Sequence, residues 1–186
     1  MGNAPYYPIE DLINFMGKTH REACLKLFLD HEERFKRARG SSHNHQAWNG
    51  GYLDHVIEVM NLGVFFYDKL TEIMDPPFSI ADAMVVLFLH DLEKAWKYTG
   101  RHDEIITKKQ REEFRLKIIN MYGIRLTKEQ ANALKYVEGE GNDYSSEKRV
   151  MNELAAFCHM CDVASSRIRH DYPKNTDDQW GLRATV

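Results

Sequence analysis

Near its middle the chain reads Ala83-Met84-Val85-Val86-Leu87-Phe88-Leu89-His90-Asp91. The seven apolar residues leave no polar face, which is typical of a helix packed at the centre of a core. Ser79, followed three residues later by Asp82, is a capping signal for the start of this helix. Ionisable groups rarely follow a core segment without a partner. The stretch therefore predicts a buried helix whose end presents an imidazole and a carboxylate to a common ligand.

Helical patterns extend along the chain on both sides of this stretch, and no convincing alternating strand pattern interrupts them. The expected helices cover residues 8–15, 19–38, 52–74 and 146–169, with two more after the capping boxes Thr107/Gln110 and Thr127/Gln130. We predict an all-α fold, a compact bundle of six to seven helices. It forms a single domain over residues 1–186, with a core at about 19–170. Residues 171–186 lack a pattern, and we expect this tail to be loosely packed or to dock on a partner subunit.

Composition narrows the class of protein. The chain has 186 residues, of which 43% are hydrophobic and 28% charged, with a net charge of −3. This balance is ordinary for a globular domain and demands neither a nucleic acid nor a membrane as partner. The apolar run from Ala83 to Leu89 is far shorter than the roughly 20 residues of a membrane-spanning helix. Three cysteines without a secretory signal indicate reduced thiols and a cytoplasmic location.

Two further positions carry groups that suit a metal. His55 follows Gly50-Gly51 at the start of a predicted helix, well before His90. Asp162 lies on the last predicted helix, among the apolar residues Leu154, Phe157, Cys158 and Cys161. A carboxylate on an apolar stripe needs a partner, and imidazole nitrogen with carboxylate oxygen suits a borderline or hard divalent cation.

The order His55, His90-Asp91, Asp162 across a helical domain resembles the HD superfamily of metal-dependent phosphohydrolases, over roughly residues 40–169. The resemblance implies that His55, His90, Asp91 and Asp162 are the metal ligands. The His-rich stretch that precedes Gly50-Gly51-Tyr52-Leu53-Asp54-His55 is similar to one branch, which includes the HD domains of some 3′–5′ exoribonucleases.

The chain departs from the usual pattern of the superfamily at two points. Many members read His-Asp-Ile-Gly-Lys, whereas here Glu93 replaces the glycine and Lys94 is retained. Members with two metals carry additional histidines between the His-Asp pair and the final Asp, where this chain has only His102 and His159. We therefore expect one divalent metal ion, which counts against the di-iron oxygenases of the same fold. Manganese, cobalt, nickel, zinc, iron and magnesium all remain open.

We add a hypothesis about the roles of the neighbouring residues. Asp91, Lys94 and Glu93 are the expected catalytic residues, with Lys94 contacting the phosphate. Glu93 either orients water or is an exposed residue at a helix end. The remaining candidates for substrate binding are His45, the arginines Arg37, Arg39 and Arg101, and Trp48.

The expected activity is hydrolysis of a phosphate ester in a nucleotide by a metal-activated water. Two alternatives stay open: a nuclease or phosphodiesterase acting on single-stranded nucleic-acid ends, and a non-catalytic module that binds a metal or nucleotide. The expected partner is a phosphorylated small molecule, and association into a homo-oligomer stays open. Cys158-His159-Met160-Cys161 has no second cysteine pair, so a structural zinc or redox role is disfavoured.

Overall fold

The computed structural model describes residues 5–42 and 45–168, and these residues form helices and loops without any strand. The α-helices are α1 (Ile9–Asn14), α2 (Lys18–Arg37), α3 (Gly51–Thr71), α4 (Ile80–Leu89), α5 (Lys94–Lys97), α6 (Lys108–Met121), α7 (Lys128–Tyr136) and α8 (Glu153–Val163). Two single-turn 3-10 helices follow α5 and α7, and a π-helix, η3 (Ala164–Ile168), continues α8. Apart from the four-residue α5, the described residues contain seven α-helices, which confirms the predicted all-α bundle.

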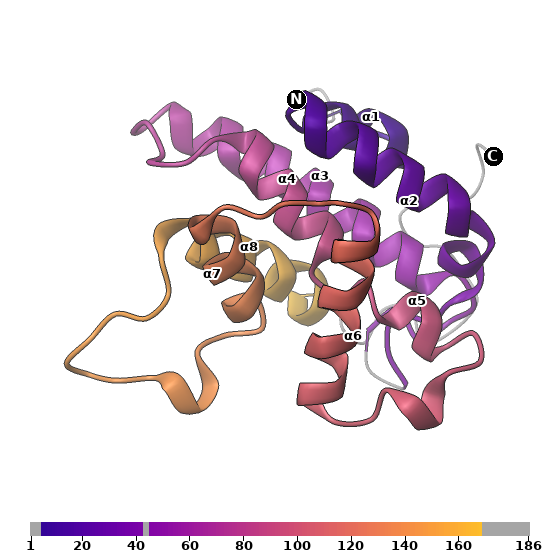
Figure 1. The fold of residues 1–186 in the computed structure, drawn as a ribbon. Coiled ribbons are helices and arrows are strands. Elements are labelled where there is room, and N and C mark those ends of the chain that lie inside the picture. Colours follow the sequence, from indigo (N-terminus) through magenta and orange to yellow (C-terminus); the bar gives the residue numbers. More distant parts are fainter. Residues whose placement is uncertain (1–4, 43–44, 169–186) are drawn as a thin grey trace.

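Helices α3 and α4 form the centre of the molecule (Figure 1). Helices α1 and α2 lie along one side of α3, and α7 and α8 pack on the other. All seven residues from Ala83 to Leu89 are fully buried, as the lack of a polar face predicts. Each large side chain of this run contributes about 1.5–3 kcal/mol of burial free energy. The most apolar helix is therefore held rigidly, and His90 follows directly at its end.

The predicted helix starts are confirmed where a side chain caps the backbone. Ser79 accepts from the Asp82 amide, and Thr107 and Thr127 each form a reciprocal capping box with the glutamine three residues later. The predicted start of the last long helix at residue 146 is wrong, because α8 begins at Glu153. Asn152 accepts from the Ala155 amide and so caps α8, and residues before it lie in a loop. The short helix α5 was not predicted.

The structure bears on the expectations about membrane segments and cysteines only in part. No helix among the described residues has the length and apolar character to cross a membrane. The thiols of Cys24, Cys158 and Cys161 are unpaired and buried, and burial raises the pKa of Cys24 to about 12. The predicted tail, residues 171–186, lies outside the described residues.

Candidate metal centre

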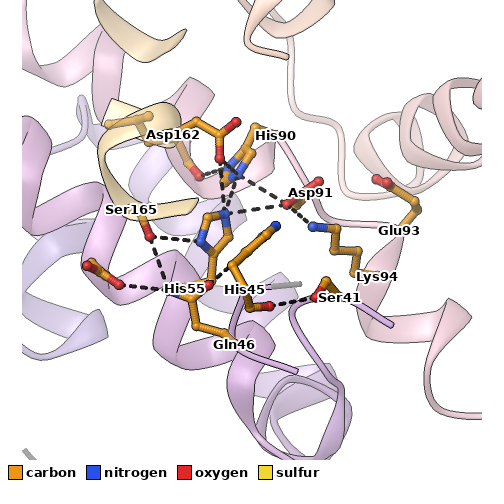
Figure 2. Close-up of polar contacts among 12 residues, drawn as sticks. Ser41, His45, Gln46, His55, His90, Asp91, Glu93, Lys94, Asp162 and Ser165 are labelled. Carbon is orange, nitrogen blue, oxygen red and sulfur yellow. Dashed lines mark hydrogen bonds and ion pairs between the residues drawn. The ribbon is translucent and has the colours of Figure 1, made fainter. Parts of the chain in front are cut away.

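Three separate segments bring the predicted ligands together (Figure 2). His55 lies in the second turn of α3, His90 and Asp91 follow the last residue of α4, and Asp162 lies in the last turn of α8. Both histidine side chains are at most 1% exposed, and the Asp91 side chain is 5% exposed. Asp162 is the most accessible of the four, at 16%. The cluster is thus a nearly closed site with one more open side at Asp162.

The distances among His55, His90 and Asp91 are close to those of ligands that share one ion, and Asp162 lies near both histidines. His55 Nε2 lies 3.1 Å from His90 Nε2, 3.3 Å from Asp162 Oδ1 and 3.5 Å from Asp91 Oδ2. His90 Nε2 lies 3.3 Å from Asp91 Oδ2 and 3.8 Å from Asp162 Oδ1. Two atoms that each bind a cation at about 2.1 Å are separated by about 3.0–3.4 Å in octahedral or tetrahedral geometry. The group His55, His90 and Asp91 can therefore hold a metal ion.

The protonation pattern of the histidines also fits a metal. His90 Nδ1 donates to the Leu87 carbonyl oxygen over 2.6 Å, and a carbonyl can only accept. In the neutral ring the lone pair is consequently on Nε2, the atom that faces the cluster. His55 Nδ1 lies 3.0 Å from Ser165 Oγ in η3. Hydrogen bonds to the second ring nitrogen are the usual way in which proteins orient metal-binding histidines.

Charge is balanced around the cluster by Lys94. Its ammonium lies 2.5 Å from Asp91 Oδ2. Burial by itself would raise the pKa of Asp91, but Lys94 and His90 outweigh it and hold this pKa well below its usual value. Burial likewise opposes the charge on His90, and the Asp91 carboxylate outweighs it and raises the pKa of His90. Burial dominates at His55 and lowers its pKa. Two anionic carboxylates thus face two imidazoles, which is a ligand set that attracts a divalent cation.

One of the two predictions for Glu93, that it is exposed at a helix end, is wrong. Its side chain is fully buried rather than exposed at a helix end, and its Oε2 forms an ion pair with Arg115 Nε over 3.3 Å. Arg115, from α6, also donates to the backbone carbonyl of His90. Burial raises the pKa of Glu93, only partly opposed by Arg115. Figure 2 shows the Glu93 side chain beyond Asp91 and Lys94, away from the histidines. Glu93 therefore contacts Arg115, which holds the backbone of His90, rather than the ligands themselves. A role in orienting water stays a prediction.

Two residues of the loop between α2 and α3, His45 and Gln46, lie beside the cluster. His45 extends from it toward the space between His55 and Lys94 (Figure 2), and the ring centroids of His45 and His55 are 4.9 Å apart. Burial lowers the pKa of His45 to about 4. The structure thus brings His45 and Lys94 to the predicted metal site.

Gln46 is the residue of this loop that sequence reasoning missed. Its side chain is hydrogen-bonded to His45, Glu58 and Ser165. Its backbone φ is +42°, and no other non-glycine residue in the described part of the chain has a positive φ. A Cβ at Gly51 would lie 1.9 Å from the Gln46 carbonyl oxygen, so this close approach requires glycine. In the sequence, the pair Gly50-Gly51 ahead of His55 was the one available sign of this close approach.

The remaining predicted substrate contacts have other surroundings. Arg37 and Arg39 are exposed, and Arg101 is exposed and paired with Glu104. Trp48 donates from Nε1 to Asp54 Oδ2 over 2.6 Å, which fixes the loop to α3. Their roles in substrate binding remain predictions.

The two additional histidines lie apart from the cluster. His102 is exposed, and His159 Nδ1 is hydrogen-bonded to the Val137 carbonyl. Within the described ranges, the group of His55, His90 and Asp91 is the single set of three or more potential ligands close enough to share an ion. Comparisons with protein-family models, with curated proteins and with solved structures gave no match to this chain.

Proposed function

We propose that this protein is a metal-dependent phosphohydrolase of the HD type that holds one divalent ion through His55, His90, Asp91 and Asp162. The observation that carries the proposal is the convergence of His55 Nε2, His90 Nε2 and Asp91 Oδ2, at separations of 3.1–3.5 Å. Asp162 Oδ1 joins them from a third segment, 3.3 Å from His55 Nε2 and 3.8 Å from His90 Nε2. Such a buried set of ionisable groups is costly unless counter-charges compensate it; Lys94 supplies one, and a divalent cation would supply the other. The resemblance of the His, His-Asp, Asp order to the superfamily points to the same four residues.

The bound ion would lower the pKa of a coordinated water and offset charge on the phosphoryl group. The protein's own groups have simpler tasks. Lys94 is the cation nearest to the ligands, and its side chain is 13% exposed, so it can reach a phosphate oxygen at the rim of the site. His45 covers the same rim and offers a hydrogen-bonding group to water or substrate. The closed walls around His55 and His90 exclude bulk water and strengthen these interactions.

We infer that the substrate is a phosphate ester of a nucleotide. Lys94 supports a phosphorylated ligand, and the resemblance to the HD superfamily supports a nucleotide. The nitrogen and oxygen donors are compatible with manganese, iron, cobalt, nickel or zinc, and less distinctively with magnesium.

The test is an assay of phosphate release from a panel of nucleotides and from a short single-stranded RNA, with manganese added to purified protein. Asp91→Asn is the inactive comparison, because it removes the anionic ligand but keeps its size. Release from nucleotides that is lost in Asp91→Asn supports the proposal. Cleavage of the RNA alone would favour the nuclease alternative, and metal binding without any release would favour a non-catalytic module.

A further inference from the structure

The hydrogen bonds of Gln46 can be satisfied in only one orientation of its side-chain amide. The amide nitrogen lies 2.8 Å from Glu58 Oε2 and 3.2 Å from Ser165 Oγ. A carboxylate oxygen accepts and does not donate, so the NH2 group of Gln46 must face Glu58. The amide oxygen therefore faces the other way, toward His45 Nδ1 at 2.7 Å.

This orientation determines which nitrogen of His45 bears the proton. The Gln46 oxygen can only accept, so His45 Nδ1 must donate to it. In the neutral ring the lone pair then lies on Nε2. Figure 2 shows the ring extending toward the space between His55 and Lys94, so this lone pair is offered on the side of the metal centre.

The backbone around Gln46 shows that its position is tightly defined. The left-handed φ of +42° is strained for a non-glycine residue, and such strain persists only where the surroundings compensate it. Gly40 N donates to the Gln46 carbonyl oxygen over 2.9 Å, and a Cβ at Gly40 would lie 2.9 Å from Gln46 Cβ. Gly40 and Gly51 thus leave room for this one conformation. Gln46 is 5% exposed, so its amide has little access to water as an alternative partner.

We propose that Gln46, held by Glu58, is a positioning residue that fixes His45 in the Nδ1-protonated form, so that His45 Nε2 accepts a hydrogen bond from water or substrate at the metal centre. Glu58 orients the amide, the amide orients the imidazole, and the imidazole presents its acceptor. The position of the proton follows from these contacts with Glu58 ionised, whereas its use in hydrolysis rests on the proposed function.

The position of the proton can be measured in the full-length, metal-free protein. Long-range 15N–1H correlation spectra at slightly alkaline pH distinguish which ring nitrogen of a neutral histidine bears hydrogen, and His45→Asn assigns the His45 signals. We expect the Nδ1-protonated form in the wild type. Gln46→Met removes the acceptor at similar size, and Glu58→Gln allows the Gln46 amide to reverse, so both variants should populate the Nε2-protonated form. Glu58→Gln decides the matter if Gln46→Met does not fold.

Ser41→Ala is the matched control. It removes a hydrogen bond of 2.7 Å to the backbone carbonyl of His45 but leaves the contacts of the ring in place. The control should keep the wild-type spectrum. If a general loosening of the loop were enough to change the tautomer, the control would change the spectrum as well. An Nε2-protonated His45 in the wild type, or an unchanged Nδ1-protonated His45 in both Gln46→Met and Glu58→Gln, would overturn the inference.

Phosphate release is measured in the same variants to separate the two proposals. If the wild type is active, Gln46→Met should lower turnover by about 10–100-fold, as is common when the support of a metal site is lost. Turnover equal to the wild type would overturn the catalytic use of Nε2. If the wild type releases no phosphate from any substrate, the proposed function fails, while the tautomer result still stands or falls by the spectra.

Discussion

Lys94 Nζ lies 2.5 Å from Asp91 Oδ2, which is the same carboxylate oxygen that faces the Nε2 atoms of His55 and His90. A divalent ion bound to this oxygen would have the ammonium as its nearest cationic neighbour. The two cations repel each other, because unit charges about 4 Å apart interact by about 4 kcal/mol at an effective dielectric constant of 20. Lys94 would therefore oppose metal binding in the ligand-free protein and, under the proposed function, contact a phosphate once the metal is bound.

The first prediction concerns Lys94→Met, which keeps the length of the side chain and removes its charge. Metal affinity should rise by about tenfold or more, because a repulsive charge is lost. Under the proposed function, phosphate release should fall by at least about tenfold, because Lys94 would no longer contact the phosphoryl group. Calorimetric titration with manganese and a steady-state assay measure the two effects. A parallel loss of both would contradict the dual role of Lys94.

The second prediction concerns the ion pair between Arg115 and Glu93. Arg115→Met leaves Glu93 buried without its cation and the His90 carbonyl without its donor, which should lower the free energy of unfolding by about 3–5 kcal/mol. In the double variant with Glu93→Met, no charge is left unpaired, so stability should partly return. Urea denaturation measures all three proteins. Equal instability of the single and double variants would show that the unpaired charge is not the cause.

The third prediction concerns the close approach of the loop to α3. Gly51→Ala should destabilise the protein by about 3 kcal/mol, since its Cβ would lie 1.9 Å from a backbone oxygen that cannot easily move. Metal affinity should fall as well, because the loop that carries His45 and Gln46 is displaced. Gly17→Ala is the control, since a Cβ there meets nothing within 4 Å. Thermal unfolding of both variants is the measurement, and equal melting temperatures would count against the tight contact.

The sequence and the structure agree best where burial alone determines the outcome. The uninterrupted apolar run before His90 predicts a central helix, and that helix is central because no face of it tolerates water. His55 and Asp162 could be predicted as ligands from their order along the chain relative to His90 and Asp91. Their convergence depends on the packing of α3, α4 and α8, which no local pattern reveals.

The supporting residues could not be predicted for a physical reason. Gln46 lies in a polar loop and Ser165 in a π-helix, so each looks like an ordinary surface residue until distant segments pack around it. Arg115 was hidden in the same way, because its partners Glu93 and His90 precede it by a full helix and loop. Polar residues of this kind acquire their role from tertiary contacts and carry no spacing signal of their own.

The fourth prediction concerns the pH dependence of metal binding. The pKa of His90 is raised by Asp91, so in the metal-free protein His90 keeps a proton to a higher pH than an ordinary histidine. This proton stabilises the metal-free fold below the ordinary pKa of histidine, and that contribution is lost as the pH rises through the raised value. A metal must displace the same proton, so metal affinity should rise with pH through this range and then level off.

Titrations with manganese across this range measure the effect, together with the protons released on binding. His102→Gln is the control, because His102 is exposed and lies outside the cluster, and it should give the same curve as the wild type. An affinity that does not change between mildly acidic and mildly alkaline pH would contradict His90 as a ligand.

The central claim is that His55, His90, Asp91 and Asp162 bind one divalent ion. The most direct measurement is equilibrium dialysis of the purified protein against manganese, with elemental analysis of the metal bound to the wild type, Asp91→Asn, His90→Gln and His102→Gln. We predict one ion per chain in the wild type and in His102→Gln, and its loss in the other two variants while they remain folded by circular dichroism. A folded wild type that binds no ion, or folded Asp91→Asn and His90→Gln variants that keep it, would contradict the claim.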